Sequence, residues 1–174
     1  TKNGGNCILT KKEHSTGTDR IFEAYKTLNP KNIDYIINLQ GDEPMIDIHD
    51  IKNLNNKGID NKSKMATLAC DIKDQKIFEN LNVVKVNTNK NLLEEGISKA
   101  KSFSRKVLLN NYTYIYHHIG IYMYKVSVLE KFVNLKKTKN ETSQNLEQLR
   151  ALENDIPIDV FLAKSRSRGV DTNK

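Results

Sequence analysis

The sequence predicts an α/β fold in which strands and helices alternate around one sheet. Short apolar runs of strand length lie at residues 34–39, 65–72 and 158–163, and segments with apolar residues at helical spacing separate them. Alternation with helices of about ten residues favours a layered fold with a mixed, mostly parallel sheet. Three strand-like runs in the middle of the chain lack strong helices between them, which indicates an antiparallel, β-rich excursion.

The N-terminal third should hold one helix, one strand and a second helix. An apolar run at Cys7–Leu9 precedes a polar loop. The first helix is expected between an N-cap at Thr18 or Asp19 and Pro30, because four apolar residues recur there at helical spacing. Strand 34–39 follows, and then a helix at about 48–57.

The remaining elements follow from the same patterns. Strands are expected at 65–72, 83–88, 100–104 and 118–125, followed by a helix at 126–135. A helix is expected at 143–153, because three leucines form an apolar stripe along it, and Ser143 is its expected N-cap. The last strand, 158–163, leads into a basic loop that ends at 169–172.

Composition excludes several classes of protein. The chain has 174 residues, enough for one domain with a core, and 28 Lys+Arg against 21 Asp+Glu give a formal charge of +7. Because most basic residues are scattered lysines, they favour a solvated surface over a nucleic-acid site. The chain has neither a long apolar run nor a leader-like N-terminus, so we expect a cytoplasmic protein without a membrane partner. Cys7 and Cys70 lack ligand spacing and are expected to be buried.

Acidic loops follow two of the expected strands. Asp42 and Glu43 come directly after strand 34–39, and Asp171 lies in the loop beyond the last strand. Ligands of open α/β sheets bind at the carboxyl ends of strands, and paired carboxylates there can share Mg²⁺. The alternative is that GDEP, at 41–44, is only a turn.

Other polar residues each have a structural alternative. The loop at 13–20 could bind an anion or a base edge, or it could simply cap the following helix. His118 precedes alternating tyrosines and could be a core residue. Glu147 and Gln148 could lie on a solvated helix face opposite the leucines. Arg166 and Arg168 could form a basic tail, or they could meet phosphates or a sugar acid beside Asp171.

Eight motifs occur in order along nearly the whole chain: HSTGTDR at 14–20, NLQGDEPMI at 38–46, MATLA at 65–69, NVVKV at 82–86, FSR at 103–105, HIGIY at 118–122, LEQLR at 146–150 and GVDT at 169–172. In this order they resemble one family, the 3-deoxy-manno-octulosonate (Kdo) cytidylyltransferases, or CMP-Kdo synthetases. The most diagnostic string is QGDEPMI.

The resemblance implies a Rossmann-like nucleotide-diphospho-sugar transferase fold and an enzyme. In the implied reaction, the anomeric hydroxyl of Kdo attacks the α-phosphate of CTP, and CMP-Kdo for lipopolysaccharide biosynthesis and pyrophosphate are formed. Asp42 and Asp171 would hold Mg²⁺ and act as the catalytic pair. We assign no general base, because a metal can lower the pKa of the attacking hydroxyl. The family dimerises through its β-rich excursion, here about residues 99–124.

The resemblance also assigns the two binding sites residue by residue. Four residues would contact CTP: Ser15, Gly17, Arg20 and Gln40. Five residues would line the sugar-acid pocket, where an arginine could neutralise the Kdo carboxylate: Arg105, His118, Tyr122, Glu147 and Gln148.

The chain departs from the family pattern at both ends. Residues 1–20 lack the expected triphosphate loop, and a closing C-terminal helix is not found after Lys174, so we expect residues 1–174 to be one incomplete domain that is inactive alone. Residues 89–114 match poorly apart from FSR.

Two alternatives remain open. One is CMP transfer to a related 2-keto sugar acid, such as 8-amino Kdo or a sialic-acid-like substrate, which a substrate panel would reveal. The other is a non-catalytic basic binding module derived from the fold, which would bind RNA in a salt-sensitive way without affinity for CTP.

Overall fold

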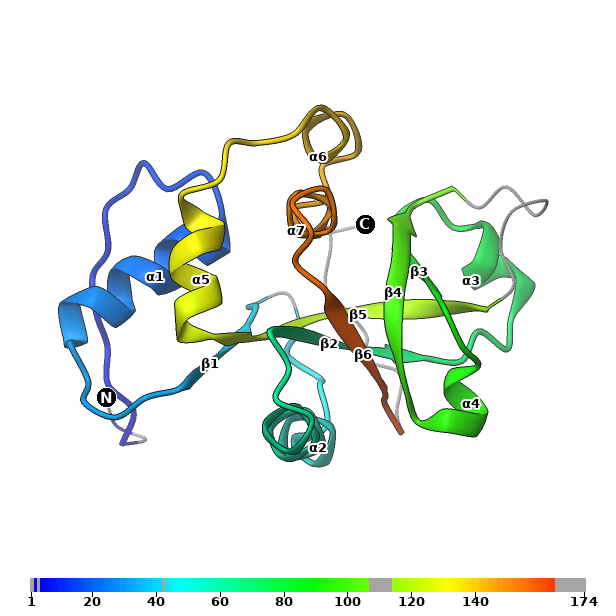
Figure 1. The fold of residues 1–174 in the computed structure, drawn as a ribbon, viewed down its shortest axis with the longest axis horizontal. Helices are drawn as coiled ribbons and strands as arrows, with labels where there is room; N and C mark the ends of the chain where they lie inside the picture. Colours follow the sequence, from blue (N-terminus) through cyan, green and yellow to red (C-terminus); the bar gives the residue numbers. More distant parts are fainter. Residues whose placement is uncertain (1, 3, 42, 107–113, 165–174) are drawn as a thin grey trace.

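The computed structural model describes residues 2, 4–41, 43–106 and 114–164. It has a single six-stranded sheet with helices on both faces (Figure 1). The strands are β1 (Tyr35–Leu39), β2 (Met65–Cys70), β3 (Lys85–Thr88), β4 (Ile97–Ser104), β5 (Ile115–Lys125) and β6 (Ile158–Leu162). The helices are α1 (Gly17–Leu28), α2 (Ile48–Asp60), α3 (Gln75–Glu79), α4 (Leu92–Glu95), α5 (Val126–Val133), α6 (Lys139–Gln144) and α7 (Gln148–Leu152).

The prediction of a mostly parallel sheet is wrong for the described residues. Only β2 and β6 pair in parallel there, and every other pairing is antiparallel. The cause is β5, an 11-residue strand that lies between β1 and β2 and runs antiparallel to both. Alternation along the chain predicts that β1 and β2 share a direction, but it does not reveal that a later strand separates them.

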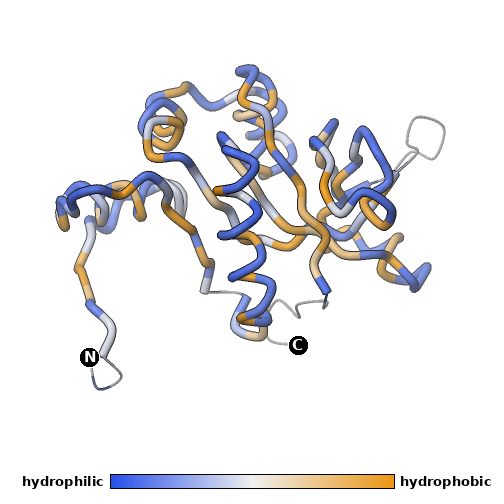
Figure 2. Tube along the Cα trace, turned by 60° about the horizontal axis from the view of Figure 1, so that its bottom comes forward, coloured by the Kyte–Doolittle hydropathy of each residue, from blue (hydrophilic) through white to orange (hydrophobic). Residues whose placement is uncertain are grey.

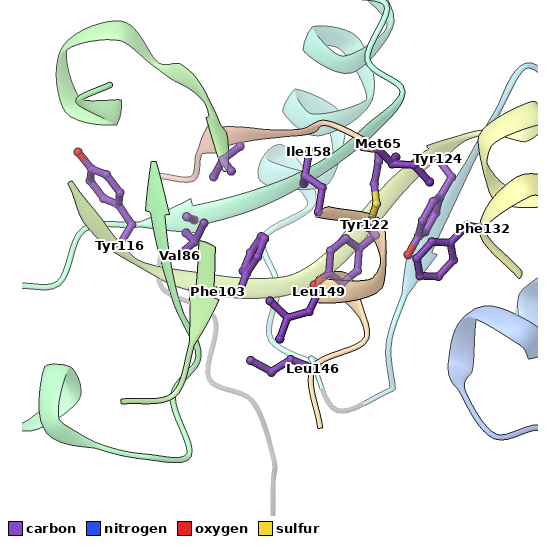
Figure 3. Packing of buried hydrophobic residues seen from close by; sticks show 14 of the residues in the cluster. Met65, Val86, Phe103, Tyr116, Tyr122, Tyr124, Phe132, Leu146, Leu149 and Ile158 are labelled. Carbon is purple, nitrogen blue, oxygen red and sulfur yellow. The ribbon is translucent and has the colours of Figure 1, made fainter. Parts of the chain in front are cut away.

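The β-rich middle of the chain belongs to the same sheet. The strand order is β1-β5-β2-β6-β4-β3, and β3 also pairs with β5. The pairings therefore close into a ring of β5, β2, β6, β4 and β3. This closure places the inner face of β5 opposite side chains of β3 and β4, including Val86 and Phe103 (Figure 3).

A register shift in β5 shapes the face that carries the site. Thr67 pairs with Tyr122, whereas the next residue, Leu68, pairs with Ile119. β5 therefore contains two extra residues, which preserve the alternation of its side chains between the two faces. His118 and Tyr122 consequently point to the same side of the sheet.

Each face of the sheet has its own apolar cluster. On one face α1, α5 and α7 cover a cluster that includes Tyr122, Phe132 and Leu149 (Figures 1 and 3). On the other face α2 packs Leu54 against a cluster that includes Met123. Figure 2 shows hydrophobic residues gathered along the strands, while much of α2 is hydrophilic.

Several local predictions need correction. Cys7 is exposed, so the prediction that it is buried is wrong, whereas Cys70 is buried as predicted. The helix predicted at 143–153 is two short helices, because Asn145 adopts a left-handed conformation with φ 52° between them. Thr138, rather than Ser143, caps α6 through a capping box with Glu141. The single-turn helices α3 and α4 were absent from the predicted pattern.

The predicted strands and the other three predicted helices, α1, α2 and α5, are confirmed to within a few residues. No helix in the described part of the chain is long and apolar enough to cross a membrane.

Candidate active site

The first turn of α1 forms one wall of the candidate site. Its N-cap is Thr16, whose side chain accepts a hydrogen bond from the Asp19 backbone N–H at 3.1 Å. The prediction of Thr18 or Asp19 as the cap is therefore wrong. The helix begins two or three residues earlier than predicted, so Thr18 lies inside it and is buried.

A small open hollow lies between this turn and the end of β1. Its volume is about 370 Å³, and three of the four residues expected to contact CTP line it, Gly17, Arg20 and Gln40. Ser15 is not among the lining residues, and its hydroxyl donates to Asp19 Oδ2 at 3.0 Å. Arg20 is held beside the hollow because its Nη1 donates to the Lys11 carbonyl oxygen at 3.0 Å.

Asn38 is a residue of this hollow that sequence reasoning missed. It lines the hollow, is 3% exposed, and its Nδ2 has no hydrogen-bond partner among the described residues. It pairs with Tyr122 across β1 and β5, so it lies beside the sugar-acid residues as well. A buried amide without a partner is costly, which makes it a candidate ligand contact. The clue in the sequence was a polar residue in an otherwise apolar strand directly before QGDEP.

The two predicted metal ligands, Asp42 and Asp171, lie outside the described residues. Gly41, directly before Asp42, lines the hollow. Glu43, directly after it, accepts a long hydrogen bond from the Gly120 backbone N–H at 3.5 Å. Within the described ranges, no group of three His, Cys, Asp or Glu side chains could hold a metal. The carboxylate chemistry of this loop suits Mg²⁺, which prefers oxygen ligands.

Two of the predicted sugar-acid residues are neighbours in a row of aromatic rings. The centres of the His118 and Tyr122 rings are 5.4 Å apart. The Phe103 ring meets the His118 ring edge-on, with 5.2 Å between the ring centres. His118 Nε2 lies 3.0 Å from Thr67 Oγ1. Burial lowers the pKa of His118 to about 3, with a smaller contribution from the charge of His117. His118 is therefore a neutral hydrogen-bonding group at neutral pH.

Burial also raises the pKa of Tyr122, the tyrosine beside His118. This pKa lies well above its ordinary value, and the nearby charges of Tyr124 and Glu147 add to the effect. Tyr122 stays a protonated phenol that can donate a hydrogen bond.

Glu147 links the start of α7 to the first turn of α1. It stands directly before α7, and its Oε2 accepts a hydrogen bond of 2.7 Å from the Thr18 hydroxyl of α1. Its Oε1 lies 3.5 Å from Arg150 Nη2. Burial raises the pKa of Glu147, and the hydroxyls of Thr18 and Thr16 partly offset that rise. Gln148 is buried at the first position of α7.

Arg105 is the one described sugar-acid residue that the structure does not bring to this group. Its Nη1 donates to the backbone carbonyl oxygen of Asn82 at 3.1 Å, and no contact with His118, Tyr122 or Glu147 is found within the described residues. The buried Lys85 ammonium donates to the Arg105 carbonyl oxygen at 2.7 Å and so fixes the end of β4.

A larger cavity of about 820 Å³ lies away from these residues. It is bounded by α2 and by the ends of β2 and β6, and its lining includes Lys57, Cys70 and Lys164. It contains none of the predicted site residues, so the candidate active site is the smaller hollow together with the adjoining His118–Tyr122–Glu147 group.

The comparisons with known proteins show a nucleotidyltransferase. A solved UDP-glucose pyrophosphorylase shares the fold with a TM-score of 0.62 to 0.63 at 15% identity, over 91% of this chain. The family model described as Cytidylyltransferase matches residues 1–159.

Individual relatives show which kind of cytidylyltransferase this chain resembles. A 3-deoxy-manno-octulosonate cytidylyltransferase from Rhodopseudomonas palustris is 40% identical over 97% of this chain and 69% of the relative. One from Thermodesulfovibrio yellowstonii is 39% identical over 97% of this chain and 70% of the relative. A solved CMP:2-keto-3-deoxy-manno-octonic acid synthetase complexed with CTP has a TM-score of 0.84 at 33% identity, over 98% of this chain and 69% of that one. The chain belongs to the 3-deoxy-manno-octulosonate cytidylyltransferase family of enzymes.

Proposed function

We propose that this protein transfers the cytidylyl group of CTP to Kdo and releases pyrophosphate. The proposal is supported by two groups of residues that lie next to each other. The hollow lined by Gly17, Arg20 and Gln40 adjoins the His118–Tyr122–Glu147 group, because Asn38 and Tyr122 are paired across neighbouring strands. A nucleotide and a sugar acid would therefore be held side by side.

The nucleotide half of the site would act by orientation. The first turn of α1 presents backbone N–H groups and a positive dipole end, which attract phosphate or the polar edge of a base. Gln40 and Asn38 offer amides that can both donate and accept hydrogen bonds, as the edge of cytosine requires. Arg20 supplies a positive charge beside the hollow.

The sugar half would recognise hydroxyl groups. Neutral His118, protonated Tyr122 and the Glu147 carboxyl group offer donors and acceptors on one face of the sheet. We further propose that Arg105 moves to the Kdo carboxylate on binding, because a bidentate arginine suits that group.

The reaction balances as a single displacement. The anomeric oxygen of Kdo forms a bond to the α-phosphorus, the bond from that phosphorus to the bridging oxygen of pyrophosphate breaks, and the hydroxyl proton is lost to solvent. Asp42 and Asp171 would hold Mg²⁺, which neutralises phosphate charge when bound. Catalysis of this kind depends mainly on positioning and electrostatics.

The proposal extends to assembly and location. A homodimer through residues 99–124 rests on the family resemblance, and sedimentation equilibrium of the purified protein tests it. A cytoplasmic location follows from the need for CTP.

A coupled assay of pyrophosphate release tests the proposal. Protein from the complete gene is expected to release pyrophosphate with CTP, Kdo and Mg²⁺, and not when Kdo is omitted. A panel with 8-amino Kdo and sialic acid would reveal a different sugar specificity. Salt-sensitive RNA binding without any turnover would contradict the proposal.

A further inference from the structure

We infer that Thr18 is a positioning residue that orients the Glu147 carboxylate toward the sugar acid. Thr18 lies on the helix that lines the nucleotide hollow, and Glu147 lies at the start of α7 on the sugar side. The inference rests on the proposed function and deepens it, because it assigns a residue on the nucleotide side to recognition of the sugar.

The contact is short and enclosed. Thr18 Oγ1 donates to Glu147 Oε2 at 2.7 Å across 129 residues of sequence, and Thr18 is 1% exposed. A hydroxyl bonded to a carboxylate makes a charge-assisted hydrogen bond, which is stronger than a neutral one.

Nothing else described holds Glu147 as closely in place. The residue has no side-chain capping bond to α7, and it follows Asn145, which breaks the helical path with a left-handed conformation. Arg150 approaches Glu147 Oε1 only to 3.5 Å, because its short hydrogen bonds go to Glu141. The Thr16 hydroxyl also lowers the pKa of Glu147, but Thr16 caps α1 and so cannot be varied without affecting the helix.

Glu147 keeps one carboxylate oxygen without a hydrogen bond. Its side chain is 23% exposed, whereas that of Arg150 is 3% exposed. Its Oε1 is buried and has no hydrogen-bond partner among the described residues, so this oxygen is the acceptor left for a sugar hydroxyl. Without the Thr18 hydroxyl, burial would raise the pKa of Glu147 further and the carboxylate would lose its fixed direction. Sugar binding should then weaken and become sensitive to pH, while nucleotide binding should not change.

Three variants test the inference. Thr18→Val keeps the shape of the side chain and removes the hydroxyl, Thr18→Ser keeps the hydroxyl, and Glu147→Gln removes the charge. Thr18→Val is expected to raise KM for Kdo about tenfold, with KM for CTP unchanged within about twofold. As pH is lowered, kcat/KM for Kdo should begin to fall at a higher pH in Thr18→Val than in the wild type. Thr18→Ser should restore both values.

A double-mutant cycle separates positioning from packing. In the Glu147→Gln background, Thr18→Val should cause little further loss, because the hydroxyl acts through that carboxylate. Thermal unfolding checks that each variant folds, and Thr18→Ala replaces Thr18→Val if the latter does not. All variants are made in protein from the complete gene, and absence of turnover in the wild type of that protein would refute the proposed function. An active wild type with normal KM for Kdo in Thr18→Val, or additive losses in the cycle, would refute this inference alone.

Discussion

The Arg150 guanidinium and the Glu141 carboxylate form a bidentate ion pair inside the protein. Arg150 Nε lies 2.9 Å from Glu141 Oε2, and Nη2 lies 2.5 Å from Oε1. Both side chains are nearly inaccessible, at 3% and 6% exposure. The guanidinium also lies 4.7 Å from the centre of the Phe132 ring. Arg150 thus fastens α7, which begins with Gln148 directly after Glu147, to α6 and α5.

Loss of either partner of this pair should destabilise the fold strongly. Glu141→Gln or Arg150→Met leaves a buried charge without its partner, which costs about 3–5 kcal/mol. Urea unfolding measures the loss. The exposed pair of Lys26 and Glu130, 3.9 Å apart, is the matched control, and Lys26→Ala should cost less than about 1 kcal/mol. Equal effects at the two sites would contradict this ranking.

His118 should make stability depend on pH in a defined window. Its pKa is about 3 in the folded protein against an ordinary value of 6.5, so the unfolded chain takes up the proton first as pH falls. The contribution is complete above pH 6.5 and is lost progressively as pH falls toward 3. Between pH 7 and 5 this one group should cost about 2 kcal/mol of unfolding free energy.

Urea unfolding at the two pH values tests the His118 prediction by comparison of variants. His118→Asn should remove that part of the pH dependence, whereas His49→Asn, at an exposed position of α2, should leave it intact. An unchanged slope in His118→Asn would mean that the imidazole can be protonated within the fold.

Asn38→Leu should separate folding from nucleotide binding. The Asn38 Nδ2 is buried without a partner among the described residues, so an apolar side chain of similar size should leave stability unchanged or raise it by up to about 1 kcal/mol. KM for CTP should rise several-fold, because the hollow loses an amide. Asn56→Leu, on the exposed side of α2, should change neither quantity. A large loss of stability in Asn38→Leu would show that the amide has a structural partner.

The predicted metal ligands can be tested by charge removal. Asp42→Asn and Asp171→Asn are each expected to abolish turnover with little loss of folding, because a neutral carboxamide is a poorer ligand for Mg²⁺ than a carboxylate. Turnover assays with circular dichroism measure both effects. Asp60→Asn, exposed at the end of α2, should retain full activity. Normal kcat in either of the first two variants would exclude that acid as a ligand.

Local sequence patterns predicted most elements of this fold. Apolar runs and helical spacing identify β1, β2, β6, α2 and α5, because burial on one face determines each pattern. They do not predict the position of β5 between β1 and β2, because strand neighbours in a sheet depend on contacts distant in sequence. The break at Asn145 was missed because the leucine stripe continues across it.

Local patterns likewise predicted one part of the candidate site and missed another. Gly17, Arg20 and Gln40 lie in motifs beside elements that the patterns predict, and they do meet at one hollow. The Thr18–Glu147 hydrogen bond and the unpartnered amide of Asn38 depend on packing between separate elements, which no local pattern contains.

The fate of the anomeric oxygen of Kdo tests the central claim most directly. Kdo labelled with ¹⁸O at the anomeric hydroxyl is incubated with CTP, Mg²⁺ and protein from the complete gene, and the products are analysed by mass spectrometry. Attack by the sugar oxygen on the α-phosphorus predicts that CMP-Kdo retains the label in its bridging position and that pyrophosphate carries none. Unlabelled CMP-Kdo, or no CMP-Kdo at all, would contradict the account.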